Sequence, residues 1–320
     1  MPGGAVGWQL TTLFHRARGR GVTVPVEVPP AGGDLRLEVA TDRRRALTGS
    51  SRAALDSLLG GSVDAQTRLV VERTLAGTGS IDSAARMAQA WGDLPERTRS
   101  EVLDPVRTLA RAGRQSDQTT CGSSALTMLI AAGDPTFALW LSSGRLITTL
   151  PVELRTAPAG ALASLADAPQ EARFAAVQRV MKRRSNSGAV LGLPWPSSLG
   201  TPPWGAARAA RFPGVTYRPR MLDDTDGTDL RGVLAAVGGW VDRQVPVPLY
   251  SGGDSAGGWS TALPRHVVLA IGRSGSDLVV WEPSAGSLET VAPDRLVAST
   301  GPVRALGGWS HLMWAVLPHC

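Results

Sequence analysis

"RQSDQTTCGSSALTMLIAAG", residues 114–133, joins a polar run to an apolar helical pattern through a single cysteine, Cys121. The apolar side chains that follow it recur at helical spacing: Ala125, Leu126, Leu129 and Ile130. This spacing predicts a helix that begins at Cys121, buries that face and is capped by Thr119 or Thr120. Helix N-termini favour anions, and thiols held there are commonly more acidic and more nucleophilic than free ones. The stretch therefore predicts a catalytic cysteine, with a buried core cysteine as the alternative.

The polar loop before the cysteine carries two candidate donors for an oxyanion site, Gln115 and Gln118. The side-chain amide of Gln115 can stabilise an oxyanion beside the sulfur, together with the backbone N–H of Cys121. Gln118 competes for this role, and either glutamine can also be an ordinary solvated loop residue. Gly122, directly after the cysteine, is expected to leave the approach to the sulfur open.

Four histidines are candidate bases for the thiol. His15 lies in an arginine-rich N-terminal segment, and His319 lies at the chain end. His266 and His311 each start an apolar run that reads as a strand, "HVVLAIG" and "HLMWAV". A histidine at a strand start can project into a cleft while the strand itself stays buried. We therefore expect His266 to be the base and keep His311 as the alternative.

Glu282 ends the next apolar run, "DLVVWEP". The intervening "RSGS" predicts a hairpin, so the start of one strand and the end of the next meet at one edge of the sheet. Strand parity puts Glu282 on the same face as Leu278 and Val280. A carboxylate there would hold the tautomer of a nearby imidazole and stabilise its charged form. An exposed glutamate at a strand end is the alternative interpretation.

Three blocks, "QSDQTTCGSSALTML", "RHVVLAIG" and "VVWEPSAG", resemble the papain-like cysteine peptidase superfamily. The most similar branch is the bacterial one that includes the double-glycine leader peptidases of bacteriocin exporters. The resemblance spans residues 114–317 and implies a helical lobe followed by an antiparallel sheet lobe. It implies these roles for the matching residues: oxyanion glutamine Gln115, nucleophile Cys121, base His266 and orienting acid Glu282. Glu282 stands where the family usually carries Asp or Asn, and Val267 stands where an aromatic residue is more usual.

We therefore expect a cysteine-dependent hydrolase, a peptidase or amidase, that acts on a peptide or protein substrate. Two alternatives stay open: a catalytically degenerate papain-like binding module, and a deamidase or transglutaminase of the same fold. Tryptophans of two irregular segments are expected to border the cleft and grip an extended chain, unless they only fill the core: Trp195, Trp204 and Trp259.

The expected fold class is α+β, with residues 111–320 as the peptidase-like domain and residues 1–110 as an N-terminal α/β extension of unknown role. The extension should hold a hairpin of strands at 22–28 and 35–40, followed by helices at 50–61, 82–93, 93–103 and 104–113. It can also mask the cleft. Beyond the cysteine helix, we expect helical sequence over 136–183 and 229–244, and strands at 245–250, 265–272, 277–283 and 311–318.

The composition bears on whether the protein binds membranes or nucleic acids. Hydrophobic residues make up 43% of the 320 residues, and no run approaches the roughly 20 apolar residues of a membrane-spanning helix. The N-terminus is a poor signal peptide, so we expect a cytoplasmic protein unless another route exports it. The net charge of +6 comes almost entirely from arginine, and the basic clusters at 41–47 and 181–188 are short. They fit solvated faces better than a nucleic-acid site.

The chain has two cysteines, Cys121 and Cys320, too few for a disulfide framework or for the usual four-cysteine zinc site. A disulfide bond between them is not expected, because Cys320 is the last residue of the chain. The sequence also shows no phosphate loop, no dinucleotide fingerprint and no cluster of metal-ligating residues at the required spacing. We expect neither a metal nor a cofactor.

Overall fold

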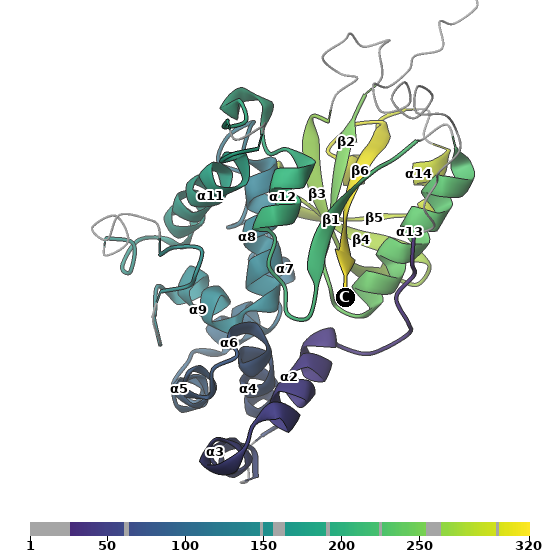
Figure 1. Cartoon of the computed structure of the whole chain (residues 1–320). Helices are drawn as coiled ribbons and strands as arrows, with labels where there is room; N and C mark the ends of the chain where they lie inside the picture. The colour runs from purple at the N-terminus through teal and green to yellow at the C-terminus, as the bar shows by residue number, and fades with distance from the viewer. Residues whose placement is uncertain are drawn as a thin grey trace, which may run out of the picture.

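Six antiparallel strands form the sheet in the C-terminal part of the chain (Figure 1). The computed structural model describes residues 26–60, 64–147, 150–155, 164–189, 193–223, 226–253, 264–298 and 301–320. The strands are β1 (Thr216–Met221), β2 (Val247–Gly252), β3 (His266–Ser274), β4 (Asp277–Glu282), β5 (Ser287–Val291) and β6 (His311–His319). Their order across the sheet is β1-β6-β2-β3-β4-β5, and every neighbouring pair is antiparallel. Together with the helices, the sheet makes a mixed α+β fold, as the sequence predicts.

Helices make up most of the described chain before β1. They are α2 (Leu35–Ala46), α3 (Gly49–Gly60), α4 (Ala65–Thr78), α5 (Ile81–Trp91), α6 (Glu96–Leu103), α7 (Pro105–Thr108), α8 (Cys121–Gly133), α9 (Pro135–Ser143), α11 (Gln170–Asn186) and α12 (Pro203–Ala209). Later helices are α13 (Gly227–Asp242) and α14 (Pro293–Val297), with short 3-10 turns η1 (Ser197–Leu199) and η3 (Arg304–Leu306). The expected strands at 245–250, 265–272, 277–283 and 311–318 are thus confirmed, whereas β1 and β5 were not expected.

Helix α8 is the central helix of the fold, and all of its 13 residues are buried. It packs against β2 and β3, while α13 covers the sheet from the other side (Figure 1). Apolar residues of α8, α13 and the central strands form one continuous core. Because α8 is held along its whole length, its first residue, Cys121, has a fixed place near the ends of the central strands.

The strand expected at 35–40 is wrong, because these residues belong to α2. Asp34 caps this helix by accepting a hydrogen bond from the backbone N–H of Arg36 at 3.0 Å, and it also pairs with the Arg36 and Arg73 guanidinium groups. An N-cap aspartate is a strong helix start signal, and it outweighs the alternating pattern of "LRLEVA". Of the other expected strand, residues 22–25 lie outside the described residues, and 26–28 form no strand.

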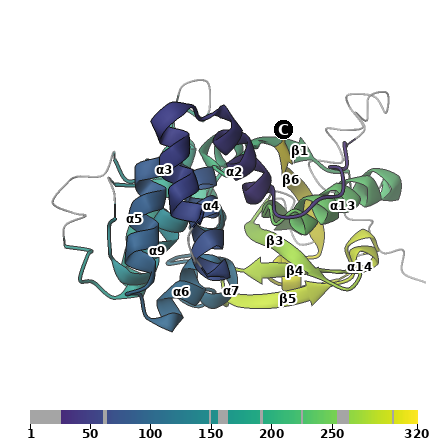
Figure 2. The same ribbon diagram turned by 90° about the horizontal axis from the view of Figure 1, so that it is seen from below.

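The N-terminal helices pack at the end of α8 that lies far from Cys121. The Arg36 guanidinium donates to the carbonyl oxygen of Ala132 at 2.5 Å, and Gly77 of α4 approaches Gly133 so closely that a Cβ would lie 2.8 Å from its carbonyl oxygen. Figure 2 shows α3, α4 and α5 grouped beside α9 and away from β4 and β5. At 1.5 Å per residue, Ala132 lies roughly 16 Å along the helix from Cys121. These contacts of α2 and α4 with α8 therefore lie far from the cysteine.

Among the described residues, no single helix is both long and apolar enough to cross a membrane. Only α8 and α9 taken together reach that length and composition, and the chain bends by 118° between them.

Candidate active site

Cys121 is the first residue of α8, and its side chain lies in the core. Thr120 occupies the N-cap position but makes no side-chain cap, contrary to expectation. Its hydroxyl instead donates to the carbonyl oxygen of Asp117 at 2.9 Å and accepts from the backbone N–H of the same residue at 3.0 Å. Thr119 also bonds to Asp117, through its carboxylate. The polar groups of the loop thus bond to one another, and the first turn of α8 has no side-chain cap. Its backbone N–H groups and the positive end of the helix dipole therefore stay available to an anion near the sulfur.

His266 begins β3; its imidazole hydrogen-bonds Glu282, and Cys121 lies close enough to raise the pKa of the imidazole. The Nε2 atom lies 2.7 Å from Oε1 of Glu282, which leaves Nδ1 as the ring nitrogen for the thiol. Gly307, just after η3, closes the other side of the ring, because a Cβ there would lie 2.4 Å from Cδ2 of His266. The structure thus brings together the three side chains expected to form a catalytic triad.

The β3–β4 register brings Glu282 to His266. Leu269 pairs with Trp281, so Glu282 falls opposite Val268 and on the side of the sheet that His266 shares. The turn after β4 then fixes the carboxylate: Oε1 accepts from the backbone N–H of Ser284 at 2.8 Å, and Oε2 accepts from that of Ala285 at 2.8 Å. These bonds hold the longer glutamate side chain in place at its strand end.

The hydrogen bonds and charges of the site oppose the effect of its burial. Burial by itself lowers the pKa of His266, but the hydrogen bonds and charges of Cys121 and Glu282 outweigh it and raise that pKa to about 9. Burial by itself raises the pKa of Glu282, but the hydrogen bonds from His266, Ser284 and Ala285 and the charge of His266 lower it to about 2. At neutral pH the imidazole is therefore protonated and the glutamate ionised.

Gln115 lies beside the turn that follows Glu282. Its backbone N–H donates to the carbonyl oxygen of Pro283 at 2.9 Å, and its Oε1 accepts from the hydroxyl of Ser284 at 3.3 Å. Because the oxygen end of the amide is engaged, the NH₂ end is the one available to an oxyanion. Gln118 is exposed, and among the described residues no comparable hydrogen bond ties it to the strand ends. Of the two glutamines, the structure brings Gln115 to the candidate site.

Gln178 of α11, which the sequence analysis missed, fixes the loop that carries Gln115. This fully buried side chain accepts from the backbone N–H of Ser116 at 3.0 Å and donates to the carbonyl oxygens of Gly113 and Arg114 at 3.0 and 2.9 Å. A signal was present in the sequence: Gln178 is a polar residue on an apolar helix face. Such buried polar groups normally hold a specific partner.

Gly122 has a packing reason to be glycine. A Cβ at this position would lie 2.6 Å from Cβ of Thr201, so the segment before α12 packs directly on the first turn of α8. The structure thus puts Gly122 against Thr201, rather than leaving open space beside the sulfur.

Trp195 and Trp204 pack edge to face, with ring centroids 5.3 Å apart, and Trp204 also meets Trp314 of β6 at 6.4 Å. Trp204 is 37% exposed, and its indole N–H donates to the carbonyl oxygen of Ala189 at 2.6 Å. The Nε1 atom of Trp195 is buried without a partner among the described residues. Trp259 lies outside the described residues.

The structure describes two of the other three histidines. His311 begins β6 and pairs with Gly252 of β2, whereas His266 is the histidine whose pKa Cys121 raises. His319 lies at the far end of β6, opposite Thr216, and His15 lies outside the described residues.

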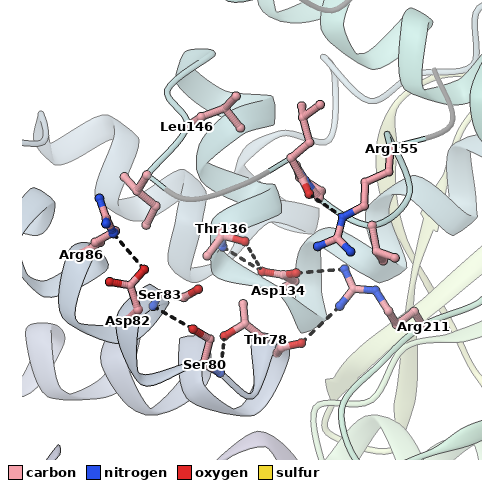
Figure 3. Close-up of a pocket in the computed structure, with 15 residues that line it drawn as sticks. Thr78, Ser80, Asp82, Ser83, Arg86, Asp134, Thr136, Leu146, Arg155 and Arg211 are labelled. Carbon is pink, nitrogen blue, oxygen red and sulfur yellow. Dashed lines mark hydrogen bonds and ion pairs between the residues drawn. The ribbon is translucent and has the colours of Figure 1, made fainter. Parts of the chain in front are cut away.

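A cavity of about 830 Å³ lies at the far end of α8 (Figure 3). Its polar walls are already paired, since Asp134 binds Arg211 at 2.9 Å and Asp82 binds Arg86 at 2.9 Å. None of the four expected catalytic residues lines it. We therefore assign it no part in the chemistry of Cys121.

Cys121 and Cys320 are both free thiols, one buried and one exposed, so no bridge joins them. Within the described part of the chain, no group of three or more His, Cys, Asp or Glu side chains is placed to hold a metal ion. In comparisons with protein-family models, with curated proteins and with solved structures, none matches this chain.

Proposed function

We propose that the protein is a cysteine-dependent hydrolase, a peptidase or amidase with a papain-like arrangement of a helical lobe and a sheet lobe. One observation carries the proposal: at an uncapped helix start, Cys121 lies close enough to His266 to raise its pKa, and His266 hydrogen-bonds Glu282. Nucleophile, base and orienting acid in mutual contact are the geometry of a thiol or serine hydrolase site.

In the proposed reaction the Cys121 thiolate attacks an amide carbonyl carbon, and a C–S bond forms. The carbonyl oxygen becomes an oxyanion, which the Gln115 NH₂ group and the Cys121 backbone N–H stabilise. The His266 imidazolium gives its proton to the leaving nitrogen as the C–N bond breaks. Neutral His266 then takes a proton from water, whose oxygen attacks the thioester carbonyl. The C–S bond breaks, the acid product leaves and the thiolate–imidazolium pair returns.

The tryptophans beside the site support a substrate with apolar segments. Trp204 is partly exposed next to the Thr201 segment that packs on α8, and the exposed Leu199 lies in η1 of the same segment. The Nε1 atom of Trp195 is buried and has no partner within the described part of the chain. We propose that an extended peptide runs along this aromatic group.

The exposure of the two thiols makes a sharp test. Accessibility alone favours alkylation of Cys320, whereas activation by His266 favours alkylation of Cys121. The measurement is the rate of iodoacetamide labelling of each thiol at pH 6, read by peptide mapping. We expect Cys121 to react faster, and we expect a His266→Gln variant to slow Cys121 but not Cys320. Turnover of a peptide library should disappear in Cys121→Ala and persist in Cys320→Ser. Faster labelling of Cys320, with turnover surviving in Cys121→Ala, would refute the proposal.

The same library separates the remaining alternatives. Ammonia release from glutamine-containing proteins without chain cleavage would identify a deamidase, and amine incorporation would identify a transglutaminase. Tight peptide binding with an unreactive Cys121 would identify a binding module. The contact between Glu282 and His266 favours the hydrolase over the binding module, because the unusual glutamate reaches the imidazole.

A further inference from the structure

A polar cavity of about 360 Å³ lies where the N-terminal helices meet the sheet. Four arginines line it, three from helices and one from a strand: Arg36 of α2, Arg73 of α4, Arg107 of α7 and Arg273 of β3. Ala132, at the end of α8 remote from Cys121, belongs to the same wall, so the cavity is separate from the proposed catalytic site. Its size is at the lower end of the usual range for small-molecule sites.

Two of these arginines, Arg36 and Arg73, share one carboxylate. Asp34 lies 2.8 Å from each of the two guanidinium groups, which are only 7% and 13% exposed. Arg36 also donates to the carbonyl oxygen of Ala132 at 2.5 Å, and Arg73 donates to that of Leu103 at 2.9 Å. Burial, and after it the charge of Arg36, lower the pKa of Arg73 despite the presence of Asp34. One carboxylate thus faces two cations on this side of the cavity.

The other two arginines, Arg107 and Arg273, carry hydrogen-bond donors that are still available. Arg107 approaches Asp104 at 3.5 Å and Arg273 approaches Asp242 at 3.2 Å, but neither guanidinium donates a hydrogen bond to a described residue. Nη2 of Arg107 reaches β3, since a Cβ on Gly272 would lie 3.2 Å from it. The four arginines have three aspartates as ion-pair partners in all, which leaves one positive charge in excess.

Gln244 adds a side chain to this wall at a position that favours glycine. It follows α13 with a φ of 62°, the only positive φ of a non-glycine residue in the described part of the chain. The backbone N–H groups of Gln244 and Val245 bond to the carbonyl oxygens of Val241 and Trp240, both at 3.0 Å, in a helix-ending turn whose left-handed residue is usually glycine. A side chain there strains the backbone, and such strain is commonly found at functional sites. Gln244 lines the cavity, and its amide makes no hydrogen bond to a described residue.

We propose that this cavity binds a phosphate group, either free or carried by a small organic molecule. A guanidinium group donates two parallel N–H bonds to neighbouring phosphate oxygens, and the excess positive charge favours an anion over a neutral ligand. A carboxylate offers only two oxygens, enough for one such fork, whereas a phosphate group has oxygens for a second one. Arg107 supplies donors from α7, Arg273 from β3 and Gln244 from the end of α13. The site does not depend on the proposed hydrolase activity.

The test is isothermal titration calorimetry of the full chain with inorganic phosphate, with acetate at the same ionic strength as the reference. We expect phosphate to saturate a single site and acetate to bind far more weakly. Arg107→Gln and Arg273→Gln should each weaken phosphate binding by about tenfold or more, because each removes charge-assisted hydrogen bonds. Neither should shift the thermal midpoint of the free protein much, since both ion pairs are partly exposed. Arg45→Gln removes the same charge from an exposed ion pair with Asp42 on α2, and it should bind phosphate like the unsubstituted protein.

Gln244→Gly separates binding from folding. Glycine adopts the left-handed conformation without strain, so this variant should be at least as heat-stable as the unsubstituted protein and yet bind phosphate more weakly. Titration with glycerol phosphate distinguishes the two sources of the group: tighter binding than that of inorganic phosphate identifies a small organic phosphate, and weaker or equal binding identifies the free ion. Phosphate binding no tighter than that of acetate, or an equal loss in Arg45→Gln and Arg273→Gln, would overturn the site and leave the hydrolase proposal untouched.

Discussion

The Nε2 atom of His266 lies 2.7 Å from Oε1 of Glu282, across two antiparallel strands joined by a hairpin. The turn that follows Glu282 donates one backbone N–H to each carboxylate oxygen, from Ser284 and from Ala285. These two backbone N–H groups thus fix the position of the carboxylate independently of its hydrogen bond to the imidazole. This arrangement explains how a glutamate fills a position for which the resemblance implies a shorter side chain.

Glu282→Gln should lower kcat/KM by on the order of 10²–10⁴ on any substrate that the library identifies. The glutamine side-chain amide has only one acceptor atom, so its NH₂ group must face either the Ala285 N–H or the imidazole. In both cases the imidazolium loses the negative charge of its partner. Glu289→Gln is the matched control, because Glu289 is a carboxylate on the neighbouring strand β5 that binds Ser287 at 2.9 Å. The control should keep full activity. Equal activity of Glu282→Gln and Glu289→Gln would contradict the orienting role.

The stability of the protein should depend on pH through this pair. His266 has a folded-state pKa of about 9 against an ordinary value of 6.5, so its contribution is complete below pH 6.5 and is lost as the pH rises through about 9. Glu282 has a folded-state pKa of about 2 against 4.5, so its contribution is complete above pH 4.5 and is lost as the pH falls through about 2. Both contributions are complete only between pH 4.5 and 6.5.

The measurement is the thermal midpoint of the unsubstituted protein and of His266→Gln from pH 2 to pH 10. The gap between the two should be widest between pH 4.5 and 6.5, and it should narrow towards pH 9 and towards pH 2. His319→Gln, at the far end of β6, controls for the loss of one imidazole. A gap that stays constant over the whole range would show that the pair does not titrate as described.

Gln115→Ala should lower kcat by about 10²–10³ while leaving the rate of iodoacetamide alkylation of Cys121 nearly unchanged. Alkylation forms no oxyanion, so the two rates separate stabilisation of the oxyanion from activation of the thiol. Gln118→Ala removes an exposed glutamine of the same loop and should affect neither rate. If Gln118→Ala lowers kcat more than Gln115→Ala does, the assignment of the two glutamines is reversed.

The sequence predicts best where a local pattern and a tertiary role agree. The helix that begins at Cys121 and the strands that begin at His266 and end at Glu282 combine clear periodicity with clear termini, and the structure contains all three. The strand expected at 35–40 failed because Asp34 caps a helix there and pairs with Arg73, a residue from a different helix. Alternation within a short segment cannot reveal a partner that lies so far along the chain.

For the same reason the sequence could not show what the supporting residues of the site contact, even where, as at Gln178, a polar residue on an apolar helix face signalled a buried polar group. Gln178 matters because α11 packs beside the loop of Gln115, and Gly307 matters because the chain returns to the His266 ring after η3. Neither relationship leaves a local motif. Thr120 shows the converse case: the sequence places a capping residue correctly at the helix start, but its hydroxyl bonds to Asp117 instead.

The contact between Gly307 and His266 gives a prediction that isolates the position of the imidazole. An alanine Cβ at position 307 would lie 2.4 Å from Cδ2 and 2.6 Å from Nε2 of His266, so the ring must move away from Glu282 or Cys121. Gly307 also has a φ of 66°, which strains any residue with a Cβ. Gly308 has a φ of 84° but no atom within 4 Å of a built Cβ. Gly308→Ala therefore reproduces the backbone strain without the clash.

We expect both variants to lose thermal stability, and only Gly307→Ala to lose most of the alkylation rate of Cys121 at pH 6. Equal alkylation rates in the two variants would mean that the imidazole can shift at this site without loss of thiol activation.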